Sequence, residues 1–319
     1  MAVTDKNWIV TYETEIPRVL PVKSIEKYAN HELINMLHLL EKDNCKGIIA
    51  MSEAAKNIEL KLIRKLLPPE NKLIRKLTVL HPPQTVLSQK KEVNNGRLRL
   101  TFVGNEFYRK GGAEVVLAIN ELIEEGELND DSLEVILIGD LTKRNNIAHG
   151  RFQDEESMYN RIEEDISSHS HFIHYTHVHH AHIIDHFLKS DLGLLPTWQE
   201  TYGYSVLEMQ ACGCPVITTN IRALSEINPD SAGWNIVCSV NEDNEIEITS
   251  EEQKMAVRMF IIERLKYYIK NIYNNRDELK SKSDNALMRI IHDHNPETFI
   301  NRINQIYKYG VDNSILQRA

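Results

Sequence analysis

Thr197-Trp-Gln-Glu-Thr-Tyr-Gly-Tyr-Ser-Val-Leu-Glu-Met-Gln-Ala-Cys-Gly-Cys-Pro-Val-Ile-Thr218 is the stretch that decides the fold of this chain. It follows an apolar run over residues 192–196 that has the length and composition of a buried strand. Gly203 then interrupts the chain, and residues 204–212 have the composition of a helix. Gly213-Cys-Pro215 ends that helix, and a further apolar run begins there. The stretch therefore predicts a strand, a loop, a helix and a second strand in succession.

The chain on both sides of this stretch continues the alternation of strands and helices. Strands are expected at 97–103, 133–138, 172–175, 192–196, 215–218 and 234–237, with helices at 111–125, 155–166, 179–188 and 204–212. Such alternation is typical of a parallel, doubly wound sheet, in which ligands bind beyond the carboxyl ends of the strands. Gly104, Gly139, Tyr175 and Glu200 lie just past such ends. We therefore expect the functional site among these loops.

Two glutamates of the central stretch have a spacing that suits a nucleotide-linked ligand. Glu200 lies in the loop before the predicted helix, and Glu208 lies about one turn into it. The free N–H groups at the start of a helix, here near residues 203–205, can bind a phosphate. Glu208 can then accept hydrogen bonds from a vicinal diol such as a ribose. Glu200 would point to whatever group lies beyond the phosphate.

Three motifs in chain order resemble the family-four glycosyltransferases. Glu200-x7-Glu208, followed by Gly213-Cys-Pro215, looks like the signature of this family. Residues 102–112, Phe-Val-Gly-Asn-Glu-Phe-Tyr-Arg-Lys-Gly-Gly, resemble its phosphate-binding loop, and residues 190–196 resemble its strand before the first glutamate. These enzymes are retaining transferases of the GT-B fold that use nucleotide-sugar donors. The resemblance extends over residues 98–240 and implies an α/β GT-B protein with a Rossmann-like donor domain.

The resemblance also implies a role for individual residues. It assigns Glu208 to the ribose, Arg109 and Lys110 to the diphosphate, and Glu200 to the sugar hydroxyls, which makes Glu200, Lys110 and Arg109 the expected catalytic residues. Asn105 stands where the family commonly has an arginine, so Arg109 is expected to supply the second positive charge. The expected donor-binding residues are Gly104, Asn105, Arg109, Lys110, His177, Val178, Glu200, Tyr202, Gly203, Tyr204, Ser205 and Glu208.

Some of these assignments leave alternatives open. His177 or Val178 is expected near the base of the nucleotide, mainly through backbone groups. One of Tyr202 and Tyr204 lines the sugar pocket, or both serve in packing. Without the neighbouring motifs, Glu208 would be interpreted as an ordinary glutamate on a helix surface. Its place among the three motifs favours a binding role.

No metal and no cofactor is expected at this site. The chain contains no Asp-x-Asp pair to hold a divalent metal, and cationic side chains with a helix N-terminus can stabilise a departing diphosphate instead. Eight histidines fall between His169 and His186, and the pair His182 and His186 has the spacing of zinc ligands on one helix face. A third ligand at motif spacing is missing from the sequence, so zinc remains the less favoured alternative.

Residues 1–95 predict a smaller α/β domain and a linker. A strand is expected at 8–12, a helix at 25–40, a strand at 47–50 and a helix that begins after Ser52 and ends near Leu67. By resemblance this is the acceptor-side domain, shorter than usual, and expected to lack the first strand and glycine-rich loop of the family. The nucleotide-sugar-binding domain is expected over 96–295, including helices at 251–275 and 276–292. The segment 296–319, with a helix at 297–309, is expected to return to the N-terminal domain.

A basic hexapeptide occurs twice in the N-terminal part. Lys61-Leu-Ile-Arg-Lys-Leu66 recurs as Lys72-Leu-Ile-Arg-Lys-Leu77. Residues 61–77 therefore predict either a solvated helix face or a peripheral contact with anionic lipid. The second interpretation suits a family that often glycosylates lipid-linked acceptors.

Composition limits the remaining function classes. A net charge of −9 argues against general nucleic-acid binding. With 42% hydrophobic and 26% charged residues, and no apolar run near the ~18 residues that cross a bilayer, a cytoplasmic protein is expected, with the inner face of a membrane as its peripheral contact.

The expected partners are a nucleotide-sugar donor and a glycan or lipid-linked acceptor. A non-catalytic nucleotide-sugar-binding module, or a subunit that needs a partner on the acceptor side, is the alternative. An NAD-dependent enzyme is disfavoured because no Gly-x-Gly-x-x-Gly follows a predicted strand.

Overall fold

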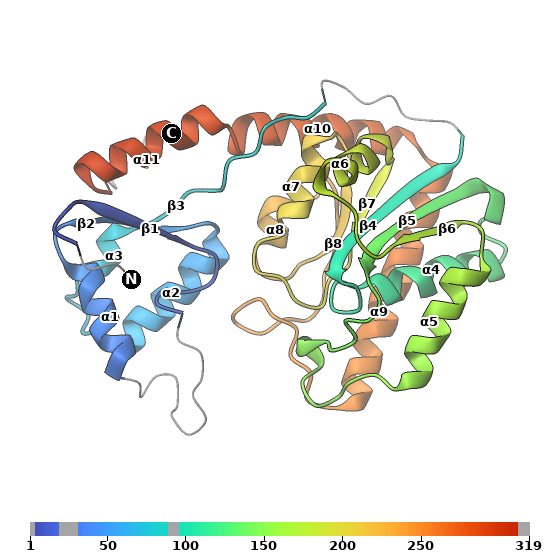
Figure 1. The fold of residues 1–319 in the computed structure, drawn as a ribbon, viewed down its shortest axis with the longest axis horizontal. Coiled ribbons are helices and arrows are strands. Elements are labelled where there is room, and N and C mark those ends of the chain that lie inside the picture. Colours follow the sequence, from blue (N-terminus) through green and yellow to red (C-terminus); the bar gives the residue numbers. More distant parts are fainter. Residues whose placement is uncertain (1–3, 19–30, 89–95, 312–319) are drawn as a thin grey trace. The chain divides into compact units, whose positions relative to one another are not determined.

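The protein is an α/β protein with two compact units. The computed structural model describes residues 4–18, 31–88 and 96–311. The first unit contains residues 1–83 and 293–319, and the second contains residues 84–292 (Figure 1). The N-terminal part of the helix expected at 25–40, and the end of the N-terminal part expected at 1–95, lie outside the described residues.

The first unit has a three-stranded parallel sheet. Its strands are β1 (Trp8–Tyr12), β2 (Cys45–Ala50) and β3 (Leu77–Val79), in the order β1-β2-β3. Its helices are α1 (His31–Glu41), α2 (Glu53–Leu66), α3 (Leu73–Lys76) and α11 (Pro296–Tyr309). α1 and α2 lie on one side of the sheet and α11 on the other (Figure 1).

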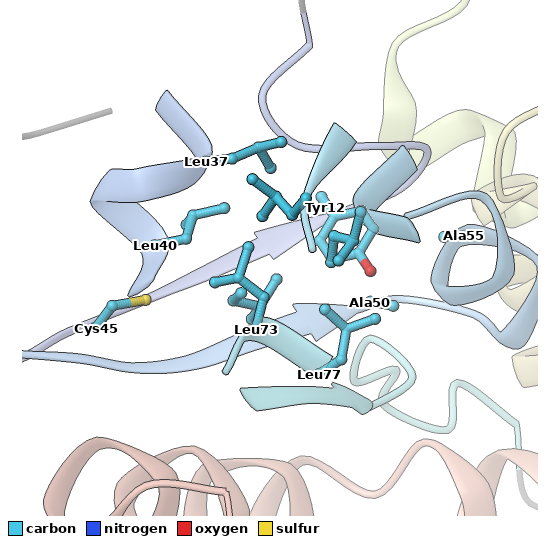
Figure 2. Close-up of a cluster of buried hydrophobic side chains, with 11 residues drawn as sticks. Tyr12, Leu37, Leu40, Cys45, Ala50, Ala55, Leu73 and Leu77 are labelled. Atoms are coloured by element: carbon cyan, nitrogen blue, oxygen red, sulfur yellow. The ribbon is translucent and has the colours of Figure 1, made fainter. Parts of the chain in front are cut away.

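A buried apolar cluster joins α1 and α3 to this sheet. Leu37 and Leu40 of α1 pack with Tyr12 of β1 and with Leu73 and Leu77 (Figure 2). On the other side, a glycine lets α11 approach β2. A Cβ atom added at Gly47 would lie 2.5 Å from Cγ2 of Ile306 in α11. The C-terminal helix is therefore an integral part of the first unit.

The second copy of the basic hexapeptide does not continue a helix. It forms the single turn of α3 and then enters β3 at Leu77, whereas the first copy lies in α2. Lys76 is half-buried, and its Nζ donates to the carbonyl oxygens of Leu40, Glu41 and Lys42 at 2.9, 2.9 and 2.7 Å. These carbonyls end α1, so Lys76 satisfies the acceptors at the C-terminus of that helix. The two copies thus have different structural roles.

The second unit has a six-stranded, fully parallel sheet, as the alternation of strands and helices predicted. Its strands are β4 (Leu98–Glu106), β5 (Leu133–Asp140), β6 (Phe172–Tyr175), β7 (Leu192–Leu195), β8 (Val216–Thr219) and β9 (Trp234–Ile236). The order is β6-β5-β4-β7-β8-β9. The order of the strands reverses between β4 and β7. In doubly wound sheets such a reversal is where ligands bind.

The helices of the second unit fall close to their predicted positions. They are α4 (Gly112–Glu124), α5 (Glu156–Ser168), α6 (His180–Lys189), α7 (Tyr204–Ala211), α8 (Leu224–Ile227), α9 (Glu251–Asn274) and α10 (Asp277–Asp293).

The short elements α3 and β3 of the first unit and α8 of the second unit were not predicted. Each has only three or four residues, which is too short for a periodic pattern to emerge.

The second unit begins earlier in the chain than residue 96. The backbone N–H groups of Leu87 and Ser88 both donate to the carbonyl oxygen of Ala211, at the end of α7, at 2.8 and 3.2 Å. Residues 84–88 thereby pack as part of this unit, and the division falls after Pro83.

Candidate active site

The loop after β4 is shaped by glycines that allow a very close approach of the chain. Gly111 has a φ of 87°, in the left-handed region, and precedes α4 as its N-cap. A Cβ atom there would lie 2.2 Å from the carbonyl oxygen of Pro196, just after β7. Only glycine fits both conditions. The loops that follow β4 and β7 are therefore pressed together at the point where the strand order reverses.

This contact brings Lys110 and Glu200 together across 90 residues of sequence. The Nζ atom of Lys110 lies 2.5 Å from Oε2 of Glu200, and the side chains are only 15% and 12% exposed. Gly104 makes room for the lysine, because a Cβ atom at Gly104 would lie 2.5 Å from Cβ of Lys110. Two residues predicted to bind neighbouring parts of one donor thus lie side by side.

The side chain of Arg109 is mostly buried and links the loop after β4 to the loop after β7 by hydrogen bonds. Its guanidinium donates to the carboxylate of Glu106, and its NH1 donates to the carbonyl oxygen of Gln199 at 2.8 Å. The hydrogen bond from Arg109 holds the pKa of Glu106 below its ordinary value. The backbone N–H of Trp198 also donates to the carbonyl of Arg109 at 3.0 Å. Sequence reasoning missed Glu106, for which the only signal was an acidic residue three positions before Arg109.

The start of α7 depends on another glycine. Gly203 is the N-cap, with a φ of 100°, and a Cβ atom there would lie 2.7 Å from Cδ2 of Leu224. Tyr202 is fully buried, whereas Tyr204 is 43% exposed. Ser205, in the first turn, is half-buried. Of the two tyrosines, Tyr204 is therefore the one whose ring a ligand can reach.

Glu208 lies beside the start of α6. Its Oε1 is 2.9 Å from Nε2 of His180, and its side chain is 25% exposed. Since α6 follows β6 and Glu208 belongs to α7, this contact joins the loops on both sides of the strand reversal. His180 was not among the predicted site residues, although it belongs to the histidine-rich segment.

The predicted base-binding residues line a cavity of about 400 Å³ next to α6. His177 and Val178 contribute to its wall, together with Tyr175, His182 and His186. Neither Lys110, Glu200 nor Glu208 lines this cavity. Asn105 is exposed at the end of β4. The structure thus brings Lys110 together with Glu200, and it places His177 and Val178 in a cavity that neither of those two residues lines.

The histidine pair on α6 has other neighbours. Nδ1 of His182 lies 3.5 Å from Oδ2 of Asp185, and the ring of His186 packs against Tyr175. Within residues 4–18, 31–88 and 96–311, no group of three or more His, Cys, Asp or Glu side chains could hold a metal ion.

A buried charged cluster supports the loop that carries Glu200. The Trp198 side chain is fully buried and packs edge-on against the ring of His149 at 4.4 Å. The guanidinium of Arg258 in α9 lies 5.7 Å from the same indole. Arg258 donates to Glu114 at 2.9 Å and to both oxygens of Asp154 at 2.9 and 2.7 Å. The position of Trp198, two residues before Glu200, therefore depends on this cluster.

Burial of His149 predicts a pH-dependent stability. Burial lowers the pKa of His149 to about 4, because its charged form loses hydration and faces Arg258 and Lys254, although Asp154 partly offsets this. The folded protein thus resists protonation of a group that the unfolded chain protonates near its ordinary pKa of 6.5. The stabilisation is complete above pH 6.5 and is lost as the pH falls from there toward about 4.

We expect this residue to contribute about 2–3 kcal/mol to the loss of unfolding free energy over that range. Urea unfolding of the wild type and of His149→Gln at several pH values measures it. Glutamine keeps an acceptor for Asn146, whose Nδ2 lies 3.0 Å from Nε2 of His149, but it does not titrate. The difference in stability between the two proteins should change with pH between 6.5 and 4, and a constant difference would contradict the expectation.

Two parallel α/β units, with a site at the strand reversal of the larger sheet, define the GT-B class of glycosyltransferases. The family model of glycosyl transferases group 1 matches residues 83–286, and the chain belongs to this family. This confirms the family resemblance inferred from the three motifs. No curated protein sequence matches the chain significantly.

Solved structures with the same fold have low sequence identity. A glycosyltransferase from Rickettsia africae is 16% identical with a TM-score of 0.58, and the match covers 98% of this chain and 71% of that one. Sucrose-phosphate synthase from Thermosynechococcus elongatus is 14% identical with a TM-score of 0.58, over 95% of this chain and 67% of that one. HepE from Anabaena, in complex with UDP, is 11% identical with a TM-score of 0.62, and the match covers 95% of this chain and 72% of that one. At these identities the similarity establishes the fold.

No described helix of the chain has both the length and the apolar character needed to cross a membrane.

Proposed function

We propose that this protein transfers a sugar from a nucleotide-sugar donor to a hydroxyl of a glycan or lipid-linked acceptor, with retention at the anomeric carbon. The observation that carries the proposal is the Lys110–Glu200 pair at the reversal between β4 and β7. A structure of the similarly folded HepE contains UDP and glucose, which supports a donor of this class. Retention follows from the resemblance of the Glu200-x7-Glu208 motif to family-four enzymes.

The proposed roles of Lys110 and Glu200 follow from the chemistry of such a donor. The diphosphate and the sugar are joined by a single bond, so side chains that bind them must be neighbours, as these two are at 2.5 Å. As the bond breaks, negative charge accumulates on the departing diphosphate, and the hydrogen bond from Lys110 strengthens. Glu200 accepts hydrogen bonds from sugar hydroxyls and holds the anomeric carbon in place.

Arg109 and the start of α7 complete the proposed donor site. Arg109 holds the loops after β4 and β7 together through Glu106 and the carbonyl of Gln199, and thereby supports the position of the neighbouring Lys110. The N–H groups at the start of α7 serve the phosphates, and Glu208 accepts hydrogen bonds from the ribose in place of His180. No metal ion is required, because the cationic side chains and the helix N-terminus neutralise the diphosphate.

Calorimetric titration with uridine, guanosine and adenosine diphosphates and their sugars, followed by an assay of sugar transfer, tests the proposal. Binding with transfer supports a glycosyltransferase, and the anomeric configuration of the product, read by NMR, tests retention. Binding without transfer would support the alternative of a non-catalytic nucleotide-sugar-binding module. Absence of binding to every nucleotide would contradict both.

Alanine variants of the two glutamates should have different effects. Glu208 is proposed to bind the ribose, which does not change during the reaction, so it contributes equally to ground state and transition state. Losing hydrogen bonds to a charged group costs about 1.5–3 kcal/mol, or roughly 10- to 150-fold in affinity. Glu208→Ala should therefore weaken binding of both the nucleoside diphosphate and the full donor.

Glu200 is proposed to contact only the sugar. Glu200→Ala should leave the affinity for the nucleoside diphosphate within about threefold of the wild type while it lowers turnover of the donor. Calorimetry and steady-state kinetics on the two variants separate these effects. If Glu200→Ala loses the bare nucleotide, or Glu208→Ala retains it in full, the assigned roles are wrong.

A further inference from the structure

A second cavity, within the first unit, has a strongly basic wall. It has a volume of about 290 Å³ and lies where the start of β2, the turn of α3 and the end of α11 meet. Among the residues that the structure describes, four cationic side chains line it, and Asp43 is the only carboxylate. The cations are Lys46, Lys72, Arg75 and Lys76. We call this cavity the basic cavity.

One of these cations, Lys76, is already hydrogen-bonded to protein atoms. Lys76 donates to the three carbonyl oxygens that end α1, so it forms a fixed part of the wall. Its pKa is lowered, first by burial and in part by the nearby charge of Lys46, although Cys45, Asp43 and Glu41 act in the opposite direction. The wall thus carries positive charges close enough to repel one another.

The other three cations differ from Lys76 in their hydrogen bonding. Within the part of the chain that the structure describes, the side chains of Lys46, Lys72 and Arg75 make no hydrogen bond or ion pair with protein atoms. Lys46 is half-buried, and Lys72 and Arg75 are exposed, so all three can reach a ligand. Together with Lys76 and Asp43, they give the described part of the wall an excess of three positive charges in a protein whose net charge is −9.

We propose that the basic cavity binds a phosphate group. A phosphate carries up to two negative charges and several acceptor oxygens, which matches ammonium and guanidinium donors that converge on one space. A binding phosphate would also remove the repulsion between Lys46 and Lys76. The cavity volume is large enough for a phosphate and part of the molecule that bears it. The phosphate of a lipid headgroup and that of a soluble molecule share this chemistry.

The duplicated hexapeptide supplies a matched control. Lys72 and Arg75 of the second copy line the basic cavity, whereas the corresponding Lys61 and Arg64 of the first copy lie in α2 and do not. The double variants Lys72→Gln/Arg75→Gln and Lys61→Gln/Arg64→Gln remove the same two charges from the same local sequence. The apolar anchors Leu73 and Leu77 remain in both, and thermal unfolding verifies that both variants fold.

Calorimetric titration with inorganic phosphate is the first measurement. Lys72→Gln/Arg75→Gln should weaken binding at least about tenfold, and Lys61→Gln/Arg64→Gln should bind as the wild type does. Phosphate could also bind at the donor site, so the same titration is made on Lys110→Ala, which should keep the binding that depends on Lys72 and Arg75. This separates the basic cavity from the proposed transferase activity, and either proposal can fail alone.

Co-sedimentation with vesicles of phosphatidylcholine, with and without phosphatidylglycerol, identifies the source of the phosphate. Loss of binding to phosphatidylglycerol vesicles only in Lys72→Gln/Arg75→Gln indicates a lipid headgroup. If phosphate binding depends on the cavity pair while vesicle binding does not, the phosphate belongs to a soluble molecule. If both double variants behave alike in both assays, the effect is one of general charge, and the proposal is overturned.

Discussion

Lys110→Ala is expected to lower turnover of the sugar donor by about 10²-fold or more, as the loss of an oxyanion donor does in other active sites. Lys110 is held at the strand reversal by Glu200, with 15% of its side chain exposed. In so enclosed a place its charge is only partly screened by water, so its interaction with a departing diphosphate is strong. Steady-state kinetics with the donor identified by calorimetry measures the effect.

A lysine of another ion pair provides the control for this variant. Nζ of Lys270 in α9 lies 2.7 Å from Glu127, and its side chain is 41% exposed. Lys270→Ala removes a lysine–glutamate pair without touching the loops after β4 and β7, so its turnover should equal that of the wild type. If Lys110→Ala kept a near-wild-type rate as well, the phosphates of the donor would have to bind elsewhere.

The second unit could be predicted from the sequence because its strands and turns have strong local signals. Each central strand is a short apolar run, and Gly203 and Gly213 mark the ends of the helix between two of them. Both residues have positive φ in the structure, which is the physical reason why glycine occupies these positions. Candidate residues could also be named, because ligands bind beyond the carboxyl ends of the strands in such a sheet.

Partners that are distant in sequence could not be predicted in the same way. The motifs placed Lys110 and Glu200 in one site, but the orientation of Arg109 toward Glu106 and Gln199 depends on how the two loops are packed. The role of Lys76 depends on the end of α1, more than 30 residues earlier. Its hexapeptide is identical to the first copy, so local sequence alone could not distinguish a surface cation from one that caps a helix.

The buried cluster around Arg258 is the clearest case of a feature hidden from the sequence. Arg258 lies 144 residues from Glu114 and 104 from Asp154, and both arginine and glutamate are usual on helix surfaces. Their side chains are nevertheless only 6%, 1% and 6% exposed. Burial alone would raise the pKa of Asp154, yet hydrogen bonds and charge from Arg258 hold it below its ordinary value. The arginine therefore keeps this carboxylate ionised inside the protein.

Arg258→Met is accordingly expected to lower the free energy of unfolding by about 3–5 kcal/mol, because it leaves the buried Glu114 without its counter-charge and Asp154 with only that of Lys254, whose Nζ lies 3.1 Å from Oδ1. Urea unfolding at neutral pH measures this. Arg161→Met on α5 is the control, since Arg161 is 63% exposed and lies 3.8 Å from Asp165. A pair whose arginine is largely in solvent contributes at most about 1 kcal/mol.

The triple variant Arg258→Met/Glu114→Gln/Asp154→Asn separates the arginine's own contacts from the cost of unpaired acids. If unpaired charge causes the loss, removing the two carboxylates should restore part of the stability that Arg258→Met loses. Loss of stability in Arg258→Met no larger than in Arg161→Met would show that water reaches Glu114 and Asp154. In that event the cluster could not be what holds Trp198, and with it the loop of Glu200, in place.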